Sequence, residues 1–372
     1  MLVDRAGRRY PLDEPRWRGD DGSPLLVEPL PGITRDDVDT TVRSQWRYAA
    51  ALPQPLGRRI TLGEGLTPLL PFDVDGVPLS VKPEWFNPTA SFKDRGTTVM
   101  MSALATQGVT EMLEDSSGNG GSSVAAYAAA AGIRATILAP ESTSPAKIQQ
   151  SRVHGASVEL VPGSRQATAD EAVRRSASTF YASHNWHPFF LQGTKLLAYE
   201  IWEDLGFRAP DAVVLPAGAG SLVLGFHVGF GELLRSGAIG RRPRLLVAQP
   251  EHCSPLVAAF AAGAPAVSPG PWSATVAEGT AIAVPVRDRE VLAAIRESDG
   301  DLAAVPEAAI GPATFELARR GLYAEPTSSI VVPAIREFVR RGSLRPGETT
   351  VVILTGSALK ASDAVGRLLT AT

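Results

Sequence analysis

The stretch from Asn87 to Gly96, NPTASFKDRG, decides the fold, because it places Lys93 among small residues in a chain that is poor in lysine. Of the 36 basic residues only five are lysines, namely Lys82, Lys93, Lys147, Lys195 and Lys360. Arginine stays protonated, whereas a desolvated lysine amine can lose its proton and form a Schiff base with a carbonyl compound. The alternative is a solvated Lys93 that is balanced by Asp94 and Arg95. The small neighbouring residues favour a reactive lysine over a solvated one.

The bulk composition indicates a globular protein of two domains that acts on a small molecule. A chain of 372 residues exceeds the size at which one hydrophobic core usually stops growing. Its content of 44% hydrophobic and 20% charged residues is ordinary for a chain with an ample core. The formal net charge is −3, and acidic and basic residues are interspersed, which does not favour binding of nucleic acid or an anionic membrane.

The cysteine content and the N-terminal sequence predict a cytoplasmic protein. Cys253 is the only cysteine, which excludes an intrachain disulfide and a zinc site made of cysteines. We interpret it as a buried thiol. The opening sequence MLVDRAGRRYPLDEP lacks the apolar run of a secretory signal, and no apolar stretch reaches the roughly 18 residues of a membrane-spanning helix.

Strand and helix signals alternate after an irregular N-terminal region, residues 1–58. Within that region, Asp36 to Ala51 carries apolar residues at helical spacing and is predicted to form a helix. The predicted strands are Ala135 to Ala139, Ser157 to Val161, Ala212 to Leu215, Leu245 to Ala248 and Thr350 to Leu354. The predicted helices between them include Val124 to Ala131 and Leu196 to Leu205. This alternation predicts an α/β fold with parallel or mixed sheets flanked by helices.

Three loops share one pattern, in which a strand or turn leads through small residues into a helix. They are Ser116 to Ser123 (SSGNGGSS), Pro216 to Ser221 (PAGAGS) and Thr355 to Ser357 (TGS). In such folds ligands bind at the carboxyl ends of the strands, where helix N-termini offer free N–H groups. We therefore expect the three loops to meet at one site.

Each loop has a structural alternative when it is taken alone. The glycines of PAGAGS let backbone N–H groups approach a phosphate, but they also suit a plain strand-to-helix turn. Asn119 could hydrogen-bond a phenolate oxygen beside an imine, or it could be a turn residue. Thr355 could offer its hydroxyl to a heteroaromatic nitrogen, or it could cap a helix.

Taken together and in this order, the blocks resemble the fold type II family of pyridoxal-phosphate enzymes, and most closely the threonine synthase family. The similar blocks are LGEGLTPLL, VKPEWFNPTASFKDRG, SSGN, GLYAEPTSS and LTGSALK. The resemblance covers about residues 60–362 and implies a two-domain fold similar to the tryptophan synthase β subunit. It implies a large cofactor-binding domain of residues 59–96 and 189–372 and a small domain of residues 97–188.

The resemblance also implies residue roles. Lys93 would form the Schiff base with pyridoxal 5'-phosphate and later move the α-proton of the substrate. Asn119 would bind the ring hydroxyl, and Thr355 would meet the pyridine nitrogen. The residues implied to bind the cofactor are Lys93, Asn119, Gly218, Ala219, Gly220, Ser221 and Thr355. The residues implied to bind the substrate are Ser116, Ser117, Gly118, His184, Asn185 and Phe190.

Two departures from the family pattern stand out. Some relatives open with a four-cysteine ribbon, whereas the similar stretch from Asp4 to Gly22 has no cysteine, so no metal is expected there. Phe190 stands where the family usually has an arginine for the substrate phosphate. His184 and His187 precede it, and they either recognise a different leaving group or are packing residues. Lys195 is interpreted as structural, and Glu278 as a pocket acid or a solvated turn residue.

We therefore expect a pyridoxal-phosphate-dependent carbon–oxygen lyase that acts on a small amino acid. It would remove a β or γ substituent, such as the phosphate of O-phosphohomoserine, and add water or another nucleophile. One alternative is β-elimination or β-replacement on serine, threonine, O-phosphoserine or an unusual amino acid. The other is a cofactor-binding module without activity. Similar enzymes are usually homodimers, and no nucleic acid or membrane partner is expected.

Overall fold

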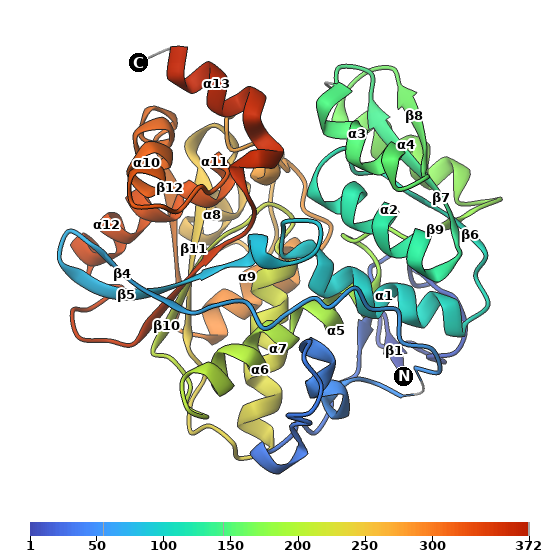
Figure 1. Ribbon diagram of the computed structural model, residues 1–372, viewed down its shortest axis with the longest axis horizontal. Helices are drawn as coiled ribbons and strands as arrows, with labels where there is room; N and C mark the ends of the chain where they lie inside the picture. Colours follow the sequence, from blue (N-terminus) through green and yellow to red (C-terminus); the bar gives the residue numbers. More distant parts are fainter. Residues whose placement is uncertain (55, 144, 371–372) are drawn as a thin grey trace.

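The computed structural model describes residues 1–54, 56–143 and 145–370, which form two helix-covered sheets and a small N-terminal sheet (Figure 1). The larger sheet has the strand order β12-β11-β10-β13-β5-β4. Its strands are β4 (Leu70–Val74), β5 (Val77–Pro83), β10 (Ala212–Pro216), β11 (Arg244–Pro250), β12 (Asp301–Val305) and β13 (Thr350–Leu354). All neighbours are parallel except β4, which pairs antiparallel with β5.

Both faces of the larger sheet are buried, which is why its strands read as continuous apolar runs. In β10, Val213 and Leu215 pack into the core that contains α7 (Ser221–Arg235) and α9 (Asp288–Glu297). The alternating residues Ala212 and Val214 face the opposite core, with α10 (Glu307–Arg319) and α12 (Val331–Arg341). Because successive side chains of the strand point to opposite faces of the sheet, β10 contributes residues to two cores.

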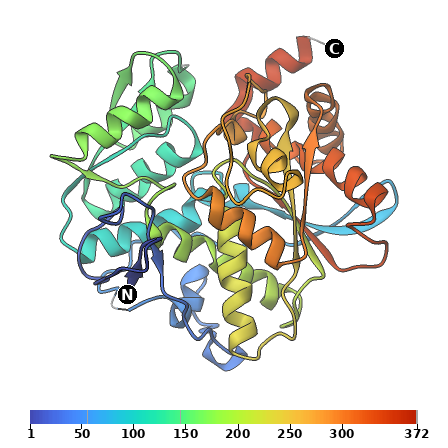
Figure 2. The same ribbon diagram turned by 180° about the vertical axis from the view of Figure 1, so that it is seen from behind.

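The smaller sheet is all parallel, with the order β8-β7-β6-β9, and forms the green lobe in Figures 1 and 2. Its strands are β6 (Glu111–Glu114), β7 (Arg134–Pro140), β8 (Ser157–Val161) and β9 (Phe180–Tyr181). The lobe also contains α2 (Asn119–Ala131), α3 (Pro145–Val153) and α4 (Arg165–Arg175). The five predicted strands and the two predicted helices are all present within one or two residues at the ends, except that α2 begins five residues earlier, at Asn119.

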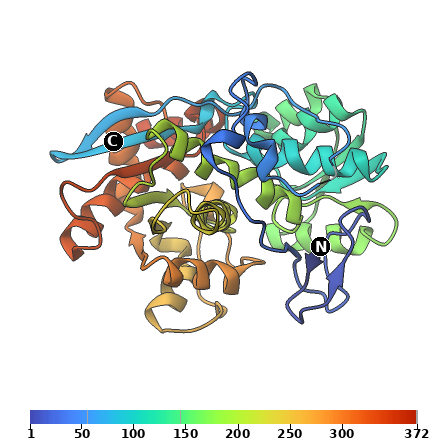
Figure 3. The same ribbon diagram turned by 90° about the horizontal axis from the view of Figure 1, so that it is seen from below.

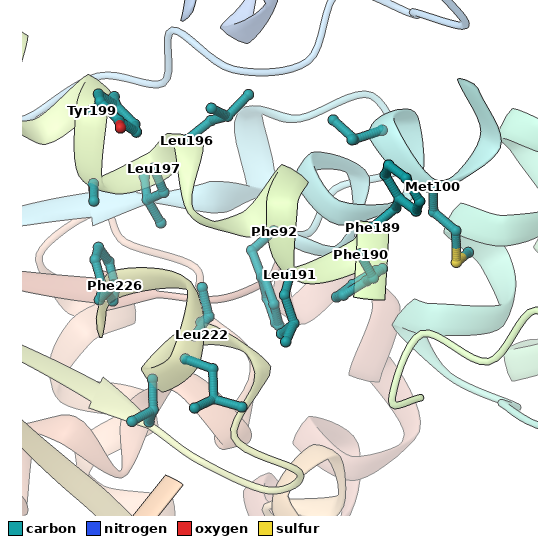
Figure 4. Close-up of a cluster of buried hydrophobic side chains, with 14 of the residues drawn as sticks. Phe92, Met100, Phe189, Phe190, Leu191, Leu196, Leu197, Tyr199, Leu222 and Phe226 are labelled. Atoms are coloured by element: carbon teal, nitrogen blue, oxygen red, sulfur yellow. The ribbon is translucent and has the colours of Figure 1, made fainter. Parts of the chain in front are cut away.

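Helices α1 (Lys93–Thr106) and α5 (Pro188–Thr194) cross closely between the two sheets. A Cβ atom at Gly193 would lie 2.0 Å from the carbonyl oxygen of Arg95, and one at Gly96 would lie 2.5 Å from the ring of Phe190. Glycine at both positions is therefore what allows the helices to approach. Figure 4 shows Phe189, Phe190 and Leu191 of α5 packed beside Phe92 and Met100.

The predicted helix from Asp36 to Ala51 is wrong. The structure has two 3₁₀-helices there, η1 (Arg35–Asp37) and η2 (Gln45–Ala51). The reason is competition from short polar side chains. The carboxylate of Asp39 accepts hydrogen bonds from the N–H and hydroxyl of Thr41, at 3.1 and 2.6 Å, and Ser44 caps η2 by accepting from the N–H of Trp46.

The N-terminal region also holds an antiparallel ribbon, which lies against the smaller lobe (Figure 3). Its strands are β1 (Leu2–Val3), β2 (Arg9–Tyr10) and β3 (Leu26–Val27).

The remaining helices are α6 (Leu196–Asp204), α8 (Pro255–Ala261), α11 (Pro326–Ser329), α13 (Ser362–Thr370), η3 (Glu84–Phe86), η4 (Glu251–Cys253), η5 (Glu278–Thr280) and η6 (Ala358–Ala361). Across the described ranges, none of the helices combines the length and apolar character that a membrane crossing requires.

Candidate active site

A cavity of ≈660 Å³ lies between the two larger sheets, and the three predicted loops all line it. Residues 116–120 follow strand β6, residues 217–222 follow β10, and Thr355 follows β13. All three strands are parallel members of their sheets, so their carboxyl ends and the helix N-termini that follow open onto the same space. The expectation that the loops meet at one site is confirmed.

Lys93 begins helix α1 and presents its amine to this cavity. Its Nζ lies 4.7 Å from the ring centroid of Phe92 and 5.7 Å from that of Phe190, and it donates no hydrogen bond to any residue that the structure describes. Burial lowers the pKa of Lys93 to about 8, although the carboxyl groups of Glu114 and Glu325 act in the opposite direction. A lysine in this state is nucleophilic near neutral pH.

The residues that follow Lys93 anchor helix α1 in a buried ionic network. The guanidinium of Arg95 donates to Glu200 Oε2 and Glu84 Oε1, each at 2.8 Å, and Lys82 lies 2.8 Å from Glu200. All four side chains are fully buried. Removing one partner of such a network leaves uncompensated charge, which typically costs about 3–5 kcal/mol. The network therefore fixes the position of the lysine.

Glu325 connects the two lobes at the floor of the cavity. Its carboxyl group accepts a hydrogen bond from Asn119 Nδ2 and another from the Thr355 hydroxyl, each at 3.0 Å. Thr355 is also 2.8 Å from the hydroxyl of Ser328. Burial raises the pKa of Glu325 above its ordinary value, despite these hydrogen bonds. Glu325 therefore stays protonated up to a higher pH than an exposed glutamate does.

The loop before α7 forms a cradle that side chains would fill. A Cβ atom at Gly218 would lie 2.9 Å from the carbonyl oxygen of Gly279. Gly220 has a φ of +84°, and a Cβ there would lie 2.3 Å from Val291. The first N–H groups of α7 have no partner within the helix and carry its positive dipole end. Residues 218–221 therefore fit the phosphate group of pyridoxal phosphate, and Lys93 fits its aldehyde.

Most of the predicted substrate residues line the cavity. Ser116, Ser117, Gly118, His184 and Asn185 do so. The hydroxyls of Ser116 and Ser117 have no hydrogen-bond partner among the described residues. The ring Nδ1 of His184 lies 2.9 Å from Glu114 Oε1, and the backbone N–H of His184 donates to the other oxygen of that carboxyl group.

Two residues of the predicted substrate wall lie elsewhere. Phe190 is fully buried beneath the amine of Lys93 and against Gly96, and it does not line the cavity. His187 is buried beside Phe180 and Phe189, and within the described ranges neither of its ring nitrogens has a hydrogen-bond partner. Burial lowers the pKa of His187 to about 3. His187 is thus a packing residue, because α5 turns this face toward the core.

The other residues singled out from the sequence have clear surroundings. Lys195 is buried away from the cavity and donates to Gln192 at 2.5 Å and to Glu232 at 2.8 Å, which agrees with a structural role. Glu278 lines the cavity and lies 3.4 Å from Arg367. Cys253 is a buried free thiol.

Sequence reasoning missed four polar residues of the cavity region. Glu114 ends strand β6 beneath His184, and Glu325 begins the block EPTSS. Arg165 opens helix α4, and Lys360 closes the block LTGSALK; both line the cavity. The available signal was weak: Glu325 and Lys360 stand in family-like blocks, but nothing in the sequence brings Glu114 or Arg165 next to Lys93.

Comparison with known proteins identifies the class. The family described as pyridoxal-phosphate dependent enzymes matches residues 60–356, and the chain belongs to that family. Solved structures with the same fold include maize serine racemase, with a TM-score of 0.67 and 21% identity over 82% of this chain and 93% of that one. The L-serine ammonia-lyase from Rhizomucor miehei has a TM-score of 0.71 and 21% identity, over 82% and 98%.

Within that family the chain is a lyase of the threonine synthase type. It is 35% identical to the threonine synthase of Methanosarcina acetivorans over 88% of this chain and 83% of the relative. It is 31% identical to the threonine synthase of Methanocaldococcus jannaschii over 98% of this chain and 93% of the relative. The predicted fold class, pyridoxal phosphate as cofactor and enzymatic lyase chemistry are therefore confirmed.

Proposed function

We propose that this enzyme removes the phosphate of O-phosphohomoserine and adds water, which gives threonine. The observation that carries the proposal is Lys93, whose amine faces the cavity where the three loops meet and has no hydrogen-bond partner in the described part of the chain. Its lowered pKa, about 8, provides neutral amine near neutral pH. The relatives named threonine synthase support this reaction over the other activities of the fold.

The residues around Lys93 would hold the cofactor in one orientation. The N–H groups of residues 218–221 would bind the cofactor phosphate. Asn119 uses one N–H for Glu325 and keeps the second for the ring hydroxyl. When bound, pyridoxal phosphate withdraws electrons from the substrate and makes its α-proton acidic. Lys93 Nζ, released from the cofactor by the substrate amine, would take up that proton.

Glu325 would control the hydroxyl proton of Thr355. Ser328 accepts from the N–H groups of Thr355 and Gly356, so its own proton is available to Thr355. A protonated Glu325 would donate to Thr355, and the hydroxyl proton of Thr355 would then be free for the ring nitrogen of the bound cofactor. A neutral hydroxyl partner keeps that nitrogen unprotonated, which suits elimination and replacement.

A second reaction has one observation in its favour. Phe190 occupies the position of the usual phosphate-binding arginine and lies under Lys93, so no cation reaches the cavity from that position of α5. Such a site would be suited to β-elimination or β-replacement on serine, threonine or O-phosphoserine.

We further propose that residues 97–188 form a small domain that moves against a large domain of residues 59–96 and 189–372. Residues 1–58 would be an extension, and the protein would be a cytoplasmic homodimer.

Covalent trapping and a substrate series test the proposal together. Borohydride treatment of the holoenzyme should fix a pyridoxyl group on the peptide that contains Lys93, and Lys93→Ala should remove both the label and the activity. O-Phosphohomoserine should be turned over to threonine with a higher kcat/KM than O-phosphoserine, serine or threonine. A label on another lysine, or full activity in Lys93→Ala, would contradict the assignment. Preference for serine would favour the second reaction.

A further inference from the structure

The cavity has to accommodate the distal group of the substrate, and its cationic side chains differ in what they can offer. Among the side chains that the structure describes, Lys93, Arg165 and Lys360 are the cations that line it. Lys93 is committed to the cofactor under the proposed function. The question is therefore which of the other two can bind an anion.

Lys360 has no hydrogen-bonding capacity left. Its ammonium donates to the carbonyl oxygen of Thr89 at 2.7 Å, to the hydroxyl of Ser122 at 2.7 Å and to the amide oxygen of Gln150 at 2.8 Å. A lysine has three N–H donors, so all three are in use. This lysine ties α2 and α3 to the segment before Lys93, and binding an anion would break those contacts.

Arg165, in contrast to Lys360, has N–H donors that are not used by the described residues. Its Nη1 donates to Asp115 Oδ2 at 2.6 Å, and its remaining N–H donors have no partner among the described residues. The side chain is 35% exposed, and its charge is close enough to disfavour protonation of Lys93 and His184. A guanidinium has five donors in a planar fork that matches two oxygens of a phosphate.

The surroundings hold this guanidinium in place. Asp115 is buried and accepts from the Tyr181 hydroxyl at 2.7 Å and from the Ser183 hydroxyl at 3.2 Å, so it is a fixed anchor. Arg165 is also the first residue of α4, a helix of 11 residues that Ser164 caps by accepting from the N–H of Ala167. The helix dipole adds positive potential on the same side.

We propose that Arg165 binds the phosphate group of a phosphorylated amino acid substrate, in place of a cation at position 190. The proposal rests on the proposed function and deepens it, because it assigns the leaving-group subsite to the smaller lobe. Phosphate is favoured over a neutral leaving group because a free guanidinium edge contributes most to binding when it meets a doubly charged, multidentate acceptor. Ser116 and Ser117, whose hydroxyls have no partner among the residues that the structure describes, line the same cavity and can complete the subsite.

The test compares Arg165→Gln and Arg165→Lys with Arg174→Gln as holoenzymes. Arg174 lies on the same helix but is 70% exposed and pairs with Glu171, so it is a matched control. Arg165→Gln should lower kcat/KM for O-phosphohomoserine, relative to the same parameter for serine, about 10- to 100-fold, mostly through KM. Arg165→Lys should lower kcat/KM less, because lysine keeps the positive charge and lacks only the planar set of donors. Arg174→Gln should stay within about twofold of the wild type.

A second readout does not depend on turnover. Calorimetric titration of the holoenzymes with inorganic phosphate should show binding to the wild type and to Arg174→Gln, and about 10- to 100-fold weaker binding to Arg165→Gln. If Arg165→Gln does not fold, the comparison of phosphate binding between Arg165→Lys and the wild type tests the inference instead. Unchanged phosphate binding in the variants, an equal loss for serine, or a preference for carboxylate substrates would overturn the inference.

The two proposals fail in different ways. If the wild type binds no phosphate and prefers serine, while borohydride still labels Lys93, the Arg165 subsite is wrong and the lyase assignment stands. If borohydride labels no peptide with Lys93, the proposed function itself is wrong.

Discussion

Lys93 differs from Lys82, Lys195 and Lys360 in having no acceptor for its protons among the residues that the structure describes. Lys82 is paired with Glu200 and Asp204, Lys195 with Glu232, and Lys360 with three oxygens. These hydrogen bonds and ion pairs occupy the protons of the three paired lysines and tie separate segments together, which agrees with a structural role. The lysine that we propose for covalent chemistry is the one whose amine has no acceptor among the described residues.

The lowered pKa of Lys93 predicts how cofactor attachment depends on pH. Only the neutral amine attacks the aldehyde, and with a pKa of about 8 its fraction rises about fivefold from pH 7 to pH 8 and levels off above pH 9. Mixing apo-protein with pyridoxal phosphate and following the absorbance change should give this profile. A rate that still rises about tenfold per pH unit up to pH 10, as for an exposed lysine, would contradict it.

The same shift has a consequence for stability. Between about pH 8 and the ordinary value of 10.5, the unfolded chain binds a proton at this lysine and the folded protein does not. The contribution of Lys93 to the free energy of unfolding of the apo-protein therefore increases as pH rises through this window, and below pH 8 the full cost of burying the charge remains.

Individual site residues were predictable only where they stand in a local sequence pattern. Lys93 and Asn119 are marked by their neighbours. Glu114, Glu325 and Arg165 are ordinary charged residues in the sequence, and what makes them important is the folded topology. Asn119 in one lobe meets Glu325 from the other across 206 positions of chain. No local periodicity encodes such a meeting.

At the scale of elements, the buried parallel strands were the easiest to predict. Strands β10 and β13 are continuous apolar runs because both faces of the sheet are covered, and such runs differ clearly from helical spacing. Strand β6 was missed because its four residues, EMLE, carry acids at both ends. The wrong helix at Asp36 to Ala51 has correct spacing, but the side chains of Asp39 and Ser44 bond the backbone instead.

The crossing of α1 and α5 gives a prediction about packing. Replacement of Gly193 by alanine would place a Cβ atom 2.0 Å from the carbonyl oxygen of Arg95, which belongs to backbone and cannot rotate away. The helices would have to separate, so we expect Gly193→Ala to lower the free energy of unfolding by about 3 kcal/mol or more. Urea denaturation of the purified variant measures this loss.

Gly366 is the control for this substitution. It lies inside α13, and apart from the backbone of its own helix no atom of the described residues is within 4 Å of a Cβ at that position. Gly366→Ala should therefore raise the free energy of unfolding, by up to about 1 kcal/mol, because alanine loses less backbone entropy in a helix. If Gly193→Ala were as harmless as Gly366→Ala, the close contact between α1 and α5 would not exist in solution.

At the scale of the whole molecule, the N-terminal ribbon connects both lobes. Trp17 packs edge-on against Tyr181 and Trp186 of the smaller lobe, with ring centroids 5.0 and 5.1 Å apart. On the other side, Arg5 donates to Glu290 of α9 at 2.7 Å. Arg287, also beside α9, donates to the carbonyl oxygen of Leu25 at 2.8 Å. The ribbon therefore restrains the lobes that enclose the cavity.

The ribbon is held together by a hydrogen-bond network around Tyr10. The hydroxyl of Tyr10 donates to Asp4 Oδ2 at 2.7 Å and accepts from the N–H of Asp20 at 2.9 Å, so it joins the turn at residues 4–8 to the turn at residues 19–23. Asp4 also accepts from the N–H of Arg8 at 2.8 Å. No cluster that could hold a metal ion occurs within the part of the chain that the structure describes.

The network predicts that the Tyr10 hydroxyl holds the two turns of the ribbon together. Tyr10→Phe would leave the buried Asp4 oxygen and the Asp20 N–H without their partner, so we expect the free energy of unfolding to fall by about 1–3 kcal/mol. Arg8→Gln, which removes only an exposed pair with Asp20, should change it by less than about 1 kcal/mol. Prolonged dialysis against EDTA should leave the melting temperature of the wild type unchanged. A fall in melting temperature that added zinc reverses would show that the turns are joined by metal, because hydrogen bonds between side chains do not respond to a chelator.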